Sequence, residues 1–225
     1  MFRAPFAALA GAALLYGCAS SPAAKQETPP AAAASPLSGL LGRQILVLPA
    51  QFLSVANAGG GWDIVPGGES VLPILDEEIA DAFRKRGVKN NWTFGRQITE
   101  SADRNGGLAG DPRNLGAAAI RRIKPGDTPL PEPLAGNVRN LVALTSARYV
   151  VLPIEVHLDL RDNERKGSVR LLLVDSRTAR VTWADDVIAQ TLRDPQVVSE
   201  AMSPYGFRMF ARDLAAKFAD MVVAQ

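Results

Sequence analysis

Apolar and polar residues alternate along residues 149–160, which is the clearest pattern in the chain. The alternating apolar positions are Val150, Leu152, Ile154, Val156, Leu158 and Leu160. A period of two predicts a β-strand with one buried face. Charged turns at 161–167 and 176–180 lead into two more strand-like runs, at 169–175 and 181–183. We therefore predict three consecutive antiparallel strands that form a meander.

Apolar residues at helical spacing predict two longer helices. The first begins near Glu69 and ends at Gly87, with its apolar positions at Leu72, Leu75, Ile79 and Phe83. Glu77, Glu78 and Asp81 are expected on its polar side. The second closes the chain after Pro204 and Gly206, with its apolar positions at Phe207, Phe210, Leu214, Phe218 and Met221.

Shorter signals complete the pattern. Residues 43–49 predict a buried strand, residues 92–94 a short strand, and residues 114–123 and 134–146 two helices. A polar loop that contains glycine is expected between residue 94 and Asp111. Together these elements predict an α/β (α+β) fold. It has a mixed sheet with a C-terminal antiparallel meander, helices packed on the sheet and a closing C-terminal helix.

The first residues form a separate segment with the composition of a secretory signal. Arg3 precedes an apolar run from residue 4 to residue 15, which is too short to cross a bilayer, since that takes about 20 apolar residues. Leu15, Tyr16 and Gly17 lead into Cys18, and this order resembles a bacterial lipobox. We predict a signal peptide at 1–17 and a lipidated Cys18; the alternative is a chance cysteine after an ordinary signal peptide.

The lipobox resemblance implies that Cys18 carries a diacylglycerol and an amide-linked acyl chain such as palmitate. Ala19 follows where an aspartate would signal retention in the inner membrane, so the resemblance implies the outer membrane. Residues 18–39 then form a tether rich in Ala, Pro and Ser, whose composition does not support a core. Residues 40–225 are predicted to form a single α/β domain in the periplasm.

The charge balance bears on nucleic-acid binding, and the cysteine content bears on disulfide bonds. The 25 basic and 23 acidic residues nearly balance, so no charge asymmetry points to a nucleic-acid partner. Cys18 is the single cysteine, which excludes an internal disulfide.

Three stretches carry a resemblance to a known group of proteins. They are ILVLPA at 45–50, the strand that begins at Tyr149, and LLLVDSRTARVTWADD at 171–186. Their order resembles the α/β domain of bacterial envelope lipoproteins. That group includes the curli-secretion lipoprotein, the lipoprotein activator of penicillin-binding proteins and the N-terminal domain of the Tol-system translocation protein. The resemblance covers residues 43–223 and implies a non-catalytic scaffold that engages other proteins. Ala179 stands where this hairpin usually has glycine.

Few residues suggest chemistry. Glu155, His157 and Asp159 share one face of the predicted strand, about 7 Å apart, and are a weak candidate for a metal site. The alternative is a solvated polar face. Trp62, in the glycine-rich segment 57–68, is the candidate anchor of a partner-binding loop. The sequence lacks a G-x-S-x-G motif, and we assign no catalytic residue and no cofactor.

The leading hypothesis is an outer-membrane lipoprotein whose domain faces the periplasm and acts as a non-enzymatic adaptor or accessory factor. Its partners would be the membrane, through the lipid anchor, and an envelope protein or a second copy of itself. Contact would use a sheet edge or the loops at 57–68 and 101–111. A periplasmic module that binds a small ligand or metal is the alternative, and an envelope hydrolase is the third possibility.

Overall fold

A mixed sheet organises the domain, as seen in a computed structural model that describes residues 37–56, 71–88, 91–123, 128–161, 164–189 and 204–223. The strand order is β3-β1-β5-β6-β7-β4, with β2 also paired to β5. The strands are β1 (Ile45–Val47), β2 (Phe52–Ala56), β3 (Trp92–Thr93), β4 (Thr128–Pro129), β5 (Tyr149–Arg161), β6 (Glu164–Asp175) and β7 (Arg180–Ile188). The pairs β1–β3, β1–β5 and β2–β5 are parallel, whereas β5–β6, β6–β7 and β4–β7 are antiparallel. The predicted mixed sheet with a C-terminal meander is confirmed.

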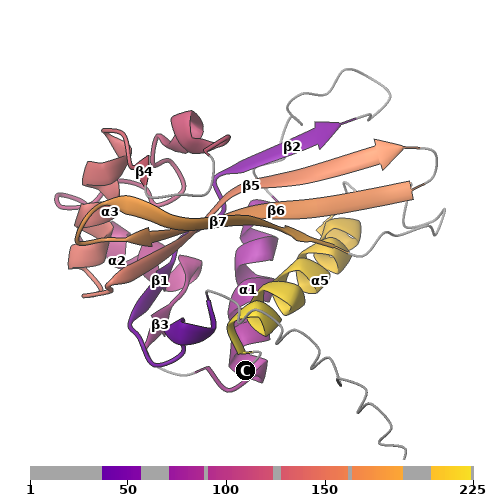
Figure 1. The fold of residues 1–225 in the computed structure, drawn as a ribbon, viewed down its shortest axis with the longest axis horizontal. Coiled ribbons are helices and arrows are strands. Elements are labelled where there is room, and N and C mark those ends of the chain that lie inside the picture. Colours follow the sequence, from indigo (N-terminus) through magenta and orange to yellow (C-terminus); the bar gives the residue numbers. More distant parts are fainter. Residues whose placement is uncertain are drawn as a thin grey trace, which may run out of the picture. The chain divides into compact units, whose positions relative to one another are not determined.

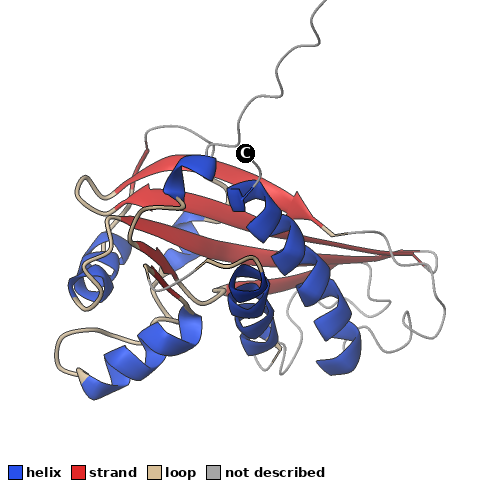
Figure 2. Ribbon diagram, turned by 90° about the horizontal axis from the view of Figure 1, so that it is seen from below, coloured by secondary structure: helices blue, strands red, loops and turns tan. Residues whose placement is uncertain are grey.

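Helices cover the sheet on both faces (Figures 1 and 2). On one face lie α1 (Leu72–Lys85) and α5 (Pro204–Val223), and their buried residues share a core with Val151, Val156 and Leu158. On the other lie α2 (Gly95–Arg104), α3 (Leu134–Ala143) and the 3₁₀ turn η3 (Ala117–Ile120), around Val150 and Leu152. A further 3₁₀ turn, η1 (Ser38–Leu40), precedes β1.

An aromatic cluster joins α1, β3 and α5. The fully buried Phe83 ring lies 4.8 Å from that of Trp92, 5.6 Å from Phe94 and 5.0 Å from Phe218, measured between centroids. Both predicted long helices are confirmed, and α1 is followed by Gly87 at φ 77°, a conformation that glycine adopts without strain. Glu78, however, was wrongly expected on the polar side, because it is buried between α1 and α5.

A bulge in β5 divides the predicted alternation into two halves. The register with β6 shifts between Pro153 and Glu155, so one extra residue is inserted into β5. Before the bulge, Val150 and Leu152 face the core on the α3 side, and Ile154, the inserted residue, packs in the same core. After it, Val156 and Leu158 face the core on the α5 side. The prediction of one buried face along residues 149–160 is therefore wrong. The even-numbered residues after the bulge face the opposite side of the sheet from those before it.

Close approach of α5 explains a glycine in β6. A Cβ atom on Gly167 would lie 3.0 Å from Cδ1 of Phe210 and 3.1 Å from Cδ2 of Leu158. A side chain at this position would require the side chains of Phe210 and Leu158 to shift by a few tenths of an ångström, so the glycine allows α5 to pack close to the sheet.

Two strands, β2 and β4, and one α-helix, α2, were missed, and one predicted helix was overestimated. Strand β2 was not predicted, because it takes its hydrogen bonds from β5, about a hundred residues later in the chain. Helix α2 was predicted as a loop, although Gln97 accepts the Phe94 N–H at 3.0 Å and so caps its start. The helix predicted at 114–123 is reduced to η3, which follows Gly116 at φ 74°.

Candidate functional site

Part of the sheet has no helix over one of its faces in the described part of the chain. In Figure 1, α2 and α3 lie together at one end of the sheet, while β2, β5 and β6 extend toward the other. Paired residues on these strands and β7 form two adjacent rows. We call this surface the open sheet face, and it consists of Phe52, Glu155, Arg170 and Asp186 in one row and Ser54, His157, Ser168 and Ile188 in the next.

A salt bridge anchors the first row. Arg121, which follows η3, donates from Nε to Oε2 of Glu155 at 3.1 Å and from Nη2 to Oε1. The same guanidinium lies over the ring of Phe52, 5.1 Å from its centroid. Burial opposes ionisation of Glu155, but the hydrogen bonds from Arg121 and Ser54 outweigh it and hold the pKa of the carboxyl below its ordinary value. Three segments distant in sequence are thereby fixed together.

Arg170 continues the row on β6. Its Nη1 atom lies 3.2 Å from a carboxylate oxygen of Asp186, and its Nη2 donates to the carbonyl oxygen of Ile123. Beside these paired charges, Ile188 is 63% exposed and Phe52 is half-buried. The open sheet face thus places one exposed aliphatic side chain and one half-buried aromatic ring among polar groups that are held by salt bridges.

The second row brings a serine to the histidine. A 2.9 Å hydrogen bond joins Ser54 Oγ and His157 Nδ1. In a serine hydrolase, the acid would orient the imidazole through its second nitrogen. Here Glu155 is instead engaged by Ser54 and Arg121. The Ser54–His157 hydrogen bond therefore serves as a polar contact between β2 and β5, and Glu155 does not supply the acid of a triad.

The predicted metal ligands share a face but do not form a site. Register places Glu155, His157 and Asp159 opposite Arg170, Ser168 and Lys166. Among the described residues, no three His, Cys, Asp or Glu side chains are grouped so that they could hold a metal ion. Because Glu155 is held by Arg121, the metal interpretation finds no support in the geometry.

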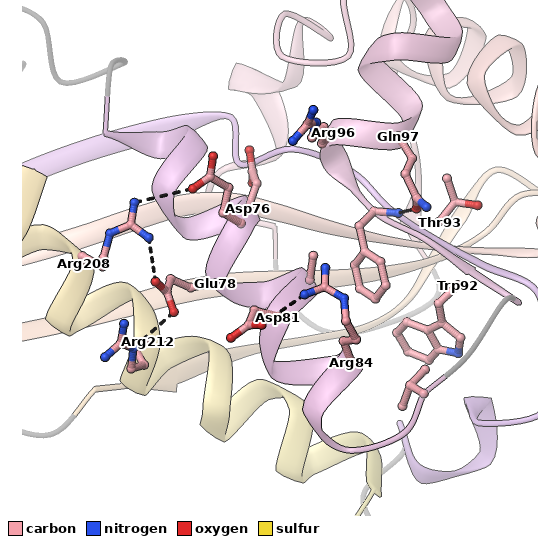
Figure 3. A pocket seen from close by; sticks show the side chains of 14 residues that line it. Asp76, Glu78, Asp81, Arg84, Trp92, Thr93, Arg96, Gln97, Arg208 and Arg212 are labelled. Carbon is pink, nitrogen blue, oxygen red and sulfur yellow. Dashed lines mark hydrogen bonds and ion pairs between the residues drawn. The ribbon is translucent and has the colours of Figure 1, made fainter.

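A groove with a volume of about 1040 Å³ lies between α1, β3, α2 and α5 (Figure 3). Its charges are paired: the buried Glu78 carboxylate accepts from Arg208 at 2.9 Å and from Arg212 at 3.3 Å. At one end, Asp76 accepts the Ala50 N–H at 3.0 Å and binds Arg113 at 2.6 Å. Burial raises the pKa of Asp76 to about 6, although both partners favour the charged form. These pairs tie α1 to α5 and to the β1–β2 connection.

The remaining predicted site residues lie outside the described residues. Cys18, residues 18–36 of the predicted tether and Trp62 with its loop 57–68 belong to this part of the chain. The last three residues assigned to the tether are described, and they belong to the domain: Leu37 is buried in the core, and Ser38 and Gly39 lie in η1. In the loop predicted at 101–111, residues 101–104 are the last turn of α2, and Leu108 is 68% exposed. Ser54, Arg121 and Arg170 were not singled out as members of the site. Strand register brings Ser54 and Arg170 to the predicted residues, and the segment after η3 brings Arg121 to Glu155.

Comparisons with known proteins give weak structural similarities. No protein-family model matches the sequence, and no curated protein matches it. The C-terminal domain of LpoB from Salmonella enterica is 13% identical over 70% of this chain and 95% of that chain, with a TM-score of 0.36. Lipoprotein GNA1162 from Neisseria meningitidis is 16% identical over 67% and 79%, with a TM-score of 0.33. The hypothetical protein CT253 from Chlamydia trachomatis is 13% identical over 80% and 98%, with a TM-score of 0.37. Similarities at this level carry no weight for function, which is argued from the chain's own residues.

Proposed function

We propose that this chain is a lipid-anchored protein on the periplasmic side of the bacterial outer membrane that binds another envelope protein and acts without catalysis. The open sheet face is the observation that carries this proposal. It presents Ile188 and Phe52 among polar side chains whose positions are already fixed, so a partner that docks there has few side chains to order.

Fixed charges on the open sheet face support a specific contact. Arg121 and Glu155 form one pair, and Arg170 and Asp186 form another. Because each arginine is matched by a carboxylate, the face carries little net charge. A partner would therefore be selected by shape, by apolar contact and by hydrogen bonds rather than by long-range attraction.

Anchoring is supported by the order of residues around Cys18. Several acyl chains, at about 0.8 kcal/mol for each buried CH₂, hold a protein at a membrane without a spanning helix. None of the helices in the described part of the chain combines the length and the hydropathy needed to cross a bilayer. The part of the predicted tether that precedes the buried Leu37, residues 19–36, has a reach of roughly 56 Å when extended and would keep the domain near its membrane.

Replacing Cys18 with serine is expected to move the protein out of the membrane fraction or to leave it unprocessed, because serine lacks the thiol that the lipid modifies. Fractionation with an immunoblot for the precursor and mature forms measures this. Ser20→Ala, two residues away, should leave both unchanged. A Cys18→Ser protein that matures and stays with the membrane would refute the anchor.

Occupancy of the open sheet face is expected to protect Ile188 in intact envelopes. Once Cys18 is acylated through its sulfur, a cysteine introduced elsewhere is the single reactive thiol. Ile188→Cys and Leu108→Cys should react with a maleimide at similar rates in the purified protein, since the original side chains are 63% and 68% exposed. In envelopes, labelling at position 188 is expected to be about tenfold slower than in the purified protein, because a partner covers the open sheet face most of the time. Labelling at position 108 should not change. Equal labelling of both positions in envelopes would argue against a partner on this face.

A further inference from the structure

A second concave surface lies where the end of α3 meets the β6–β7 turn. Its volume is about 400 Å³, and three arginines line it, Arg139, Arg148 and Arg177. Ser146 and Ser176 add hydroxyl groups, and the other lining residues are aliphatic. Among the described residues that line it, none is acidic, so this part of the pocket carries charge of one sign, unlike the groove beside α1.

Two turns that form the pocket are locked to each other. The Ser176 N–H donates to the Arg148 carbonyl oxygen at 3.0 Å. The Ser176 hydroxyl donates to the same oxygen at 2.8 Å and to that of Ala147 at 3.1 Å. The backbone that carries Arg148 and Arg177 is therefore held in place before any ligand arrives, which is what an electrostatic binding site requires.

The same two turns hold unfavourable backbone conformations. In the described part of the chain, the non-glycine residues with positive φ are Ser146 at 56° and Ala179 at 52°, one in each turn. A left-handed conformation costs free energy for residues with a Cβ atom, and such residues gather at functional sites. Ser146 is one of the residues that line the pocket, whereas Ala179 lies in the same turn as Arg177 without lining it.

The three arginines of the pocket are paired with only two carboxylates among the described residues. Arg139 contacts Glu132 at 3.1 Å on the exposed surface, and Arg148 reaches Asp175 at 3.5 Å while lying over the ring of Tyr149. Arg177 is exposed and forms no ion pair with any other described residue. Guanidinium groups present paired N–H donors that match the oxygens of a phosphate.

We propose that the pocket formed by Arg139, Arg148 and Arg177 binds a phosphate-type oxyanion. The ligand is a phosphate group, supplied either by a lipid headgroup or by a soluble phosphate compound. A competing explanation is that the arginines merely complement the carbonyl end of α3. That explanation predicts no selective response to phosphate, so a binding experiment separates the two.

The test uses the full mature chain in maltoside micelles, which contain no phosphate. Side-chain Nε–H signals of the arginines are followed by NMR during titration with inorganic phosphate or pyrophosphate, with sodium chloride at matched ionic strength as the comparison. Saturable shifts of Arg148 and Arg177 with the phosphates, but not with chloride, are expected. The variants Arg177→Gln and Arg139→Gln should each weaken binding about tenfold or more. Arg96→Gln, an exposed arginine on α2, should not.

A vesicle arm distinguishes the two sources of phosphate. The mature chain is bound to vesicles of phosphatidylglycerol mixed with phosphatidylcholine, and the same arginine shifts are compared with those on phosphatidylcholine alone. Shifts that depend on phosphatidylglycerol assign the site to a lipid headgroup, whereas shifts with phosphate or pyrophosphate alone assign it to a soluble phosphate. Either result supports the proposal. Equal shifts with chloride, or unchanged phosphate affinity in Arg177→Gln and Arg139→Gln, would overturn it.

Discussion

Replacing Phe83 with alanine is expected to lower the free energy of unfolding by about 4 kcal/mol, the typical cost of removing a fully buried aromatic ring. Phe83 is 0% exposed and contacts Trp92, Phe94 and Phe218. Its removal would open a cavity where α1, β3 and α5 meet, and each of the three contacts also loses its aromatic pairing.

Urea denaturation of the full chain measures this loss. Met209→Ala on α5 is the control, because Met209 is 39% exposed and its truncation should change stability by only about 0.5 kcal/mol. A loss below about 1.5 kcal/mol for Phe83→Ala would show that the aromatic cluster does not hold α1, β3 and α5 together as described.

The pH dependence of stability is expected to reveal the buried Asp76. Its pKa is about 6 in the folded chain and 3.8 for an ordinary aspartate, so the folded chain binds this proton more tightly than the unfolded chain. The stabilisation from this raised pKa is complete below the unfolded value and is lost as pH rises through about 6. Relative to Asp76→Asn, the wild type should therefore lose on the order of 3 kcal/mol between about pH 3.5 and pH 7.5.

Asp81→Asn on the same helix is the matched control. Lys85 donates a hydrogen bond to Asp81 and lowers the pKa of that exposed carboxyl. Stability from a lowered pKa is present above the unfolded value and lost as pH falls, so the sign is opposite. Unfolding curves at a series of pH values give both differences. A wild-type minus Asp76→Asn difference that stays constant or grows with pH would contradict the burial of a carboxylate at this site.

Local periodicity was sufficient to predict the elements that pack on the core along their whole length. Helices α1 and α5 and the strands of the meander all repeat apolar residues at a regular spacing. Helix α2 escaped prediction because its middle buries little more than Ile98 and Ala102. Its start also depends on a cap that Gln97 provides to Phe94.

Contacts between distant segments account for what the sequence did not reveal about the open sheet face. The shared face of Glu155 and His157 follows from their spacing. Their hydrogen-bond partners cannot be predicted from this spacing, since Arg121 is 34 residues from Glu155 and Ser54 is 103 residues from His157. The bulge near Pro153 adds a second difficulty, because an inserted residue changes which face each later side chain occupies without disturbing the alternation in the sequence.

Burial of Glu78 has a similar cause. On a helical projection of α1 it lies at the border of the charged side, between Lys85 and Ala82, and nothing nearby in the sequence predicts that another helix covers it. Arg208 and Arg212 come from α5, 130 and 134 residues later, and they enclose its carboxylate. Helix–helix packing, rather than the pattern within α1, decides the environment of this side chain.

Photo-cross-linking in intact cells tests the central claim most directly, namely that another envelope protein docks on the open sheet face. p-Benzoylphenylalanine is placed at Ile188, at Leu108 and at Glu100, of which the first two are large, exposed apolar residues on different surfaces. The account predicts a discrete adduct from position 188, identified by mass spectrometry as a different envelope protein, and none from positions 108 and 100. Adducts from position 108 alone, adducts with a second copy of this chain alone, or monomer at all three positions would contradict it.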